Sequence, residues 1–108
     1  MINLLDETVE AIRKAGKSRT DVNWVGTIDG EYYCSMDHFA QMAETFDYDN
    51  GYGGQEVRDS LVVVFTDGSW LERGEYNGAE WWEYKAIPIL EPDSGALILL
   101  GHRDIFED

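Results

Sequence analysis

Apolar positions near the start of the chain recur with the period of an α-helix. Three of them lie four and three residues apart on one face: Leu5, Val9 and Ile12. Asn3 stands before them as a capping residue, and Gly16 stands after them as a terminator. The pattern predicts a helix over residues 4–15 that buries these three side chains.

A second helical pattern follows Ser35, which is a good N-cap residue. Its apolar positions share one helix face: Met36, Phe39, Ala40 and Ala43. We expect a helix over about residues 36–45. The next segment, residues 47–54, is rich in Gly and Asn and is expected to form an irregular loop.

The rest of the chain alternates in hydrophobicity or forms short β-branched runs, which are typical of strands. The expected strands are Val22–Ile28, Glu31–Cys34, Leu61–Thr66, Ser69–Tyr76, Ala79–Ala86 and Ala96–Leu100. Hairpin turns are expected at Asp29-Gly30, Asp67-Gly68 and Asn77-Gly78. The sequence thus predicts a single α+β domain over residues 1–108, an antiparallel β-meander of about five or six strands with two short helices.

The Asn77-Gly78 turn, taken as a two-residue turn, sets two pairs of carboxylates directly opposite each other, Glu72 with Glu83 and Glu75 with Glu80. Each such like-charge pair destabilises a sheet by roughly a few tenths of a kcal/mol. Two pairs in one hairpin indicate that a positive charge from outside completes the surface. Alternatively, a slipped register, a bulge, or the cations Arg73 and Lys85 relieve them.

The Asp67-Gly68 turn, treated in the same way, sets Phe65 opposite Trp70 and Val63 opposite Glu72. One sheet face then collects Leu61, Val63, Phe65, Trp70, Tyr76 and Trp81. The other face collects Val62, Val64, Leu71, Trp82 and Tyr84. Both faces are apolar enough to be covered by the helices or to bind a partner, and the sequence leaves that choice open.

Charge changes this picture, because the chain carries 22 acidic and 8 basic residues and a net charge of −14. The excess is uneven: residues 1–20 are close to neutral, and no Lys or Arg occurs from Thr20 to Val57. Such a surface repels nucleic acid and anionic lipid and attracts basic partners. The single cysteine, Cys34, excludes a disulfide scaffold and fits a reducing, cytoplasmic setting, and the first residues resemble a helix more than a signal peptide.

Motifs for catalysis or metal binding are weak. The segment starting Asp47-x-Asp49 begins like a calcium loop, but Tyr52 and Arg58 occupy the positions of its required Gly and Glu. Glu72 and Glu83 match the spacing of a retaining glycosidase, yet a meander of this size offers little room for a cleft. We therefore expect no enzymatic activity, no metal and no cofactor.

The run WLERGEYNGAEWWEYK, from Trp70 to Lys85, resembles a motif of short acidic proteins encoded by phages and mobile elements. Those proteins also tend to have a Trp-Val-Gly strand before an Asp-Gly turn, as at residues 24–30, and an acidic Gly-rich loop, as at residues 48–54. Small acidic phage proteins include anti-CRISPR and anti-restriction inhibitors, several of which present carboxylates in place of DNA phosphates. The resemblance implies an anti-CRISPR protein and assigns no role to individual residues.

The combined expectation is a non-enzymatic, DNA-mimic-like inhibitor that binds a basic nucleic-acid-binding surface of a host defence complex. The candidate partner-binding residues are Glu72, Glu75, Glu80, Glu83, Asp47, Asp49, Glu56 and Trp81. Trp and Tyr are the usual anchors of protein interfaces, although most of the hairpin aromatics are expected in the core. Two alternatives stay open: an immunity or adaptor protein that neutralises a basic toxin or partner, and a housekeeping module whose acidity serves only solubility.

Overall fold

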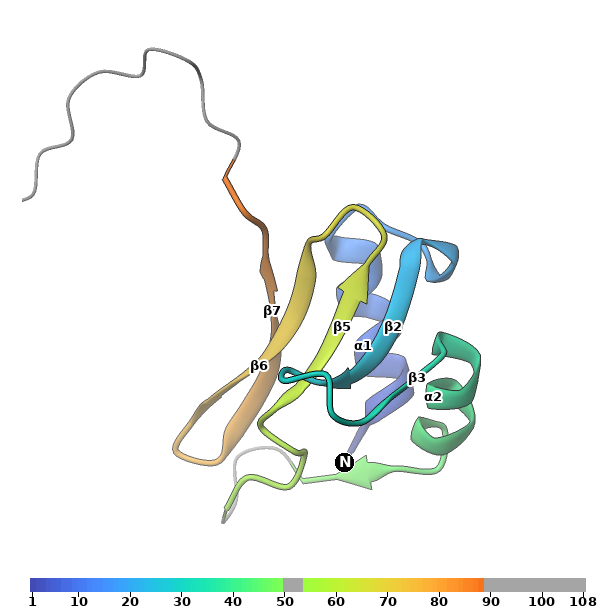
Figure 1. Cartoon of the computed structure of the whole chain (residues 1–108). Helices are drawn as coiled ribbons and strands as arrows, with labels where there is room; N and C mark the ends of the chain where they lie inside the picture. Colours follow the sequence, from blue (N-terminus) through green and yellow to red (C-terminus); the bar gives the residue numbers. More distant parts are fainter. Residues whose placement is uncertain (50–53, 89–108) are drawn as a thin grey trace, which may run out of the picture.

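A computed structural model describes residues 1–49 and 54–88 and has an α+β fold (Figure 1). A five-stranded antiparallel sheet has the strand order β3-β2-β5-β6-β7, and a second sheet pairs β1 with β4. The elements are β1 (Ile2–Asn3), α1 (Leu4–Lys14), η1 (Arg19–Asp21), β2 (Val22–Thr27), β3 (Tyr33–Cys34), α2 (Met36–Ala43), β4 (Asp47–Tyr48), β5 (Leu61–Phe65), β6 (Trp70–Tyr76) and β7 (Ala79–Lys85). The expected strand Ala96–Leu100 lies outside the described residues.

Helix α1 forms where predicted, but it is rotated relative to the expected buried stripe. The Asn3 side chain caps it by accepting a hydrogen bond from the Asp6 backbone N–H at 3.0 Å. Leu4, Thr8 and Ile12 are buried, whereas Val9 is 36% exposed. The prediction for Val9 is therefore wrong, because a polar residue takes the inward position: the Thr8 hydroxyl is satisfied by the Leu4 carbonyl at 2.7 Å.

Helix α2 confirms the second helical pattern and ends two residues earlier than expected. Ser35 accepts a hydrogen bond from the His38 backbone N–H at 3.1 Å, so it is the N-cap. All four apolar positions of the predicted face are buried: Met36, Phe39, Ala40 and Ala43. In the described part of the chain, neither helix is long and apolar enough to cross a membrane.

The segment after α2 contains a short strand that was not predicted. β4 pairs antiparallel with β1, with Ile2 opposite Tyr48 and Asn3 opposite Asp47. The Asn3 side-chain N–H₂ group also donates to the Glu44 carbonyl at 2.9 Å and to Asp47 Oδ1 at 2.8 Å. A two-residue strand carries no periodic signal, so composition alone indicated a loop here.

The β6–β7 register is the predicted one throughout, including Glu72 opposite Glu83 and Glu75 opposite Glu80. Asn77 has φ 53° and Gly78 has φ 87°, which are the left-handed values of a type I′ turn. These values explain why Asn-Gly occupies the turn. The like-charge pairs are thus real features of the sheet, and neither a slipped register nor a bulge relieves them.

The β5–β6 register differs from the prediction by one residue. Val64 lies opposite Trp70, and Val63 lies opposite Leu71. The connection contains three residues, because the Phe65 N–H pairs with the Ser69 carbonyl and Gly68 takes φ 91°. The Asp67 carboxylate accepts the Ser69 backbone N–H at 2.9 Å and closes this longer turn.

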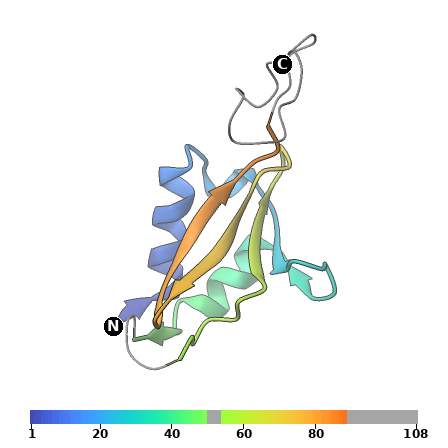
Figure 2. The same ribbon diagram turned by 90° about the vertical axis from the view of Figure 1, so that its left-hand side faces the viewer.

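This shift decides which side chains of β5 face the helices. Side chains from β5 move to the opposite face from the one expected, as a one-residue slip requires. The helix-covered side holds the core, which includes Val25, Val63, Phe65, Leu71 and the buried residues of α1 and α2. Figure 2 shows α1 on one side of the sheet and the β2–β3 connection projecting from the other. We call this other side, with Trp24, Val62, Val64 and Trp70, the open face.

We expect the Asn3→Ala substitution to lower the free energy of unfolding by about 2 kcal/mol, since it removes the cap and two further hydrogen bonds. Ser35→Ala removes only the cap of α2 and is expected to cost about 1 kcal/mol. Chemical denaturation of both variants measures the difference. Equal losses would show that the contacts from Asn3 to Glu44 and Asp47 do not contribute.

Candidate partner-binding surfaces

The eight candidate residues do not form one surface. Glu80 is buried inside the protein, with 1% exposure. Four exposed carboxylates gather at one end of the sheet: Asp47, Asp49, Glu56 and Glu75. Glu72, Glu83 and Trp81 belong to the central part of β6 and β7, on the strand positions that alternate with the buried ones.

Arg73 is the centre of a buried polar cluster between the sheet and α1. Its side chain has 0% exposure. One guanidinium nitrogen lies 3.3 Å from Glu7 Oε1, and the other lies 3.1 Å from the Tyr48 hydroxyl and 3.3 Å from Glu80 Oε1. The guanidinium carbon is also 4.7 Å from the ring centroid of Trp82, a cation–π distance. These contacts join α1, β4, β6 and β7 around a single charge.

Glu80 has a structural position that removes it from the predicted acidic surface. Besides Arg73, its carboxylate accepts the backbone N–H groups of Glu56 at 2.6 Å and Val57 at 3.1 Å. Both oxygens therefore hold the chain segment that leads into β5 against the hairpin. The prediction of Glu80 as a partner contact is wrong, because a carboxylate buried with an arginine does not reach a partner.

Contacts inside the protein therefore relieve the repulsion between the carboxylates of Glu75 and Glu80. Glu80 is neutralised by Arg73, and Glu75 accepts the Gly78 backbone N–H at 2.7 Å across the turn. The alternative that Arg73 relieves a like-charge pair is confirmed for these two residues. Glu75 itself stays exposed.

The four exposed carboxylates define what we call the acidic end: Asp47, Asp49, Glu56 and Glu75. Contacts through the interior connect two of them, because Glu56 is bound through its backbone to Glu80, the cross-strand partner of Glu75. Figure 1 shows β4, the chain start and the β6–β7 turn at the same lower end of the sheet. Arg58 lies nearby, with its guanidinium 5.8 Å from the ring centre of Tyr32 in the β2–β3 connection.

The second like-charge pair, Glu72 and Glu83, lies on the open face, and its carboxylates accept hydrogen bonds from tryptophan side chains. The indole N–H of Trp70 donates to Glu72 Oε1, and the indole N–H of Trp81 donates to Glu83 Oε2, both at 2.8 Å. Trp81 lies against Gly74, where an added Cβ would come within 2.5 Å of its indole nitrogen. Lys85 is 3.6 Å from Glu83 Oε1, so it offsets one of the two charges.

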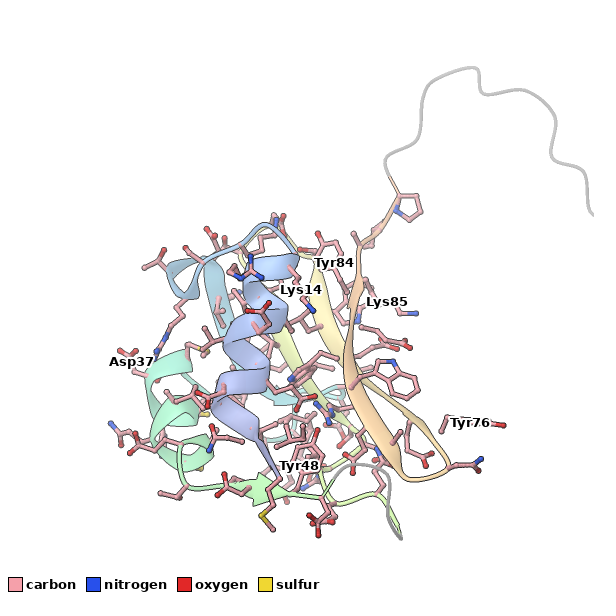
Figure 3. The ribbon with its side chains drawn as sticks, turned by 180° about the vertical axis from the view of Figure 1, so that it is seen from behind. Lys14, Asp37, Tyr48, Tyr76, Tyr84 and Lys85 are labelled. Atoms are coloured by element: carbon pink, nitrogen blue, oxygen red, sulfur yellow. The ribbon has the colours of Figure 1, made fainter. Side chains whose placement is uncertain are left out.

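Two cavities flank the sheet on opposite sides. On the open face, a groove of about 190 Å³ is lined by Trp24, Ile28, Val62, Val64 and Trp70. On the helix side, a larger groove of about 410 Å³ runs between α1 and β7, and Figure 3 shows Lys14 and Tyr84 near its upper part. Glu7, Glu10 and Lys14 line this larger groove, so it carries both signs of charge.

Cys34 and the metal-binding residue types offer little chemistry. In the parts of the chain that the structure describes, no group of three or more His, Cys, Asp or Glu side chains is placed to hold a metal ion. Burial raises the pKa of the Cys34 thiol, which keeps it protonated and weakly nucleophilic. Cys34 packs against the core, as expected of a small apolar residue.

Comparison of the chain with protein-family models, with curated proteins and with solved structures found no match. The class defined here is therefore structural: an α+β protein in which two helices cover one face of a five-stranded antiparallel sheet. Function has to be inferred from the acidic end and the open face.

Sequence reasoning missed the Arg73 cluster because two of its members come from distant segments. Glu7 is 66 residues from Arg73, and Tyr48 is 25 residues away. One signal was available: the predicted hairpin register sets Arg73 beside Leu71 and opposite Trp82, two apolar neighbours that indicate burial. A buried arginine requires carboxylate partners, and Glu80 lies on the same face of the hairpin.

We expect Glu80→Gln to lower the free energy of unfolding by about 3 kcal/mol, because it breaks the fully buried ion pair of Arg73 and leaves the less buried Glu7 to balance that charge. Its cross-strand neighbour provides the matched control, since Glu75→Gln removes an exposed charge and should change stability by at most about 0.5 kcal/mol. Urea denaturation of both variants tests this. If the two variants are equally stable, Glu80 is not the counter-ion of Arg73.

The ionisation of Tyr48 is expected to lower the stability of the protein at alkaline pH. Burial raises its pKa to about 12 from the model-peptide value of 10.0. The folded state therefore keeps the phenol protonated while the unfolded state ionises, so this stabilisation is complete below pH 10 and is lost as the pH rises toward 12. Denaturation between pH 9 and 12 should show a smaller decline in Tyr48→Phe than in the wild type. Identical slopes would contradict it.

Proposed function

We propose that this chain is a non-enzymatic inhibitor of the anti-CRISPR or anti-restriction type, which binds a basic nucleic-acid-binding surface and excludes DNA from it. The observation that carries the proposal is the acidic end, four exposed carboxylates on three separate segments that reach the same end of the sheet: Asp47, Asp49, Glu56 and Glu75. Arg73, which contacts Glu80 behind this end, is buried and already paired, and Arg58, two residues from Glu56, is an exposed cation beside it.

A surface of this kind suits a site built for phosphate. Clefts that bind DNA place Lys and Arg against the phosphate backbone, and most of the binding free energy comes from neutralising those charges. Carboxylates presented to the same cleft take the place of the phosphates. The net charge of −14 adds a long-range field that speeds the encounter with a basic partner.

The architecture supports a rigid presentation of these charges. Asp47 is tied to Asn3 through β1 and β4, Glu56 is held by its backbone on Glu80, and Glu75 is fixed at a tight turn. Rigid side chains lose little entropy on binding, and binding to a preformed surface is therefore favoured. The same contacts leave the carboxylates of Asp49 and Glu56 exposed.

Competition with DNA tests the proposal. We expect the protein to displace labelled DNA from at least one member of a panel of purified CRISPR effector complexes and restriction enzymes. The association rate should fall steeply as salt rises, because a Debye length of about 10 Å at 0.1 M screens exposed charges. A variant with Asp47→Asn, Asp49→Asn and Glu56→Gln should lose at least about tenfold in affinity, as expected when charge-assisted contacts are removed.

The matched control replaces charges of the same sign elsewhere, with Asp37→Asn and Glu31→Gln, which lie outside the acidic end and are exposed. Loss of competition in both variants would show that only net charge matters. Tight binding to a basic toxin, without any displacement of DNA from the panel, would overturn the inhibitor proposal in favour of an immunity protein.

A further inference from the structure

We propose that the open face is a docking site for an arginine-bearing segment of a protein partner, with Glu72 as the carboxylate that receives the guanidinium. This inference stands apart from the proposed function, since no residue of the acidic end takes part in it. The open face is the side of the sheet that neither α1 nor α2 covers (Figures 1 and 2).

The first observation is an apolar groove on the open face, with a buried residue, Val62, at its base and an exposed one, Ile28, at its edge. It has a volume of about 190 Å³ and is lined by two tryptophans and three aliphatic side chains, Trp24, Trp70, Ile28, Val62 and Val64. The register places Val64 between Trp24 and Trp70, so the lining crosses three neighbouring strands. Trp24 and Trp70 are half-buried here, and tryptophan side chains at a surface groove are typical anchors of protein interfaces.

The second observation is the charge at the rim of that groove. Glu72 lies opposite Val62, one of the groove residues, and opposite Glu83 on its other side. Lys85 forms an ion pair with Glu83 at 3.6 Å. Glu72 receives the Trp70 indole N–H on Oε1, a neutral donor that orients the carboxylate without cancelling its charge. The three charged groups therefore leave one negative charge in excess at the groove.

The geometry favours arginine over lysine. A guanidinium is planar, donates two parallel hydrogen bonds to a carboxylate and stacks flat on an aromatic ring. An ammonium group is a compact, strongly hydrated point charge that has neither the two-pronged geometry nor a flat face to stack. Glu72 offers the carboxylate, and the Trp70 indole is fixed beside it by their mutual hydrogen bond. An arginine that pairs with Glu72 thus also finds an aromatic surface in a fixed orientation.

The apolar groove determines which kind of residue the partner segment carries near its arginine. Side chains on one face of an extended peptide are two residues apart, about 6.6–6.8 Å. A partner segment with an aliphatic residue two positions from its arginine reaches the groove and Glu72 together. The partner is therefore a segment with the pattern aliphatic-x-Arg, bound against the open face.

The experiment titrates the ¹⁵N-labelled protein with the peptide acetyl-Leu-Ala-Arg-amide at millimolar concentration. The chain has four tryptophans, and each gives one indole N–H signal. We expect the signals of Trp70 and Trp24 to shift, while Trp82 stays unchanged because its indole is bound to Thr8 on the helix-covered side at 2.9 Å. The lysine peptide should bind at least about threefold more weakly, and the citrulline peptide should cause no shift.

Three variants test which carboxylate binds the arginine of the peptide. Glu72→Gln should weaken the arginine peptide by at least about tenfold, Glu83→Gln should have a smaller effect because Lys85 already offsets that residue, and Asp37→Asn, an exposed carboxylate on α2, should have none. An unchanged Trp82 signal shows that each variant is folded. Equal binding of the arginine and lysine peptides, shifts confined to Trp82, or an unaffected Glu72→Gln variant would overturn the proposal, whatever the outcome of DNA competition.

Discussion

The arrangement of the elements depends on one buried charge, the guanidinium of Arg73, which requires partners inside the protein. An arginine charge inside a protein is costly unless carboxylates and hydrogen-bond acceptors surround it. Arg73 meets that requirement with Glu7, Tyr48 and Glu80, which belong to α1, β4 and β7. Each of these elements is therefore held in place by the same charge, and the short β1–β4 sheet packs where the Tyr48 hydroxyl completes the set.

The β6–β7 hairpin serves the interior and the surface at once. Successive residues of a strand point to opposite sides, so Arg73 and Glu80 enter the buried cluster while Glu72 and Glu83 lie on the open face. Both cross-strand carboxylate pairs come from one register, yet their environments differ. In one pair, Glu80 is buried with a cation. In the other, tryptophan N–H groups bind both carboxylates at the surface, and Lys85 offsets the charge of Glu83.

Local signals were sufficient for much of the fold and insufficient for the site. The caps Asn3 and Ser35, the face of α2 and the Asn77-Gly78 turn depend on neighbouring residues, and the sequence predicted them correctly. The β5–β6 register failed because Asp67 binds Ser69 and lengthens the turn, which a dipeptide signal does not reveal. Glu80 was misassigned because its partners Glu56 and Val57 are over twenty residues away. Long-range pairing of this kind has no periodicity to detect.

The sequence separations within the Arg73 cluster set an order for folding. Arg73 and Glu80 are seven residues apart, in a hairpin closed by a turn whose backbone strongly favours it, so their loop closes at little entropic cost. Tyr48 and Glu7 are separated from Arg73 by 25 and 66 residues and arrive only after longer loops close. We therefore expect the hairpin to form early, with its charges hydrated until α1 docks. Docking of α1 brings Glu7 to Arg73 and completes the burial of that charge.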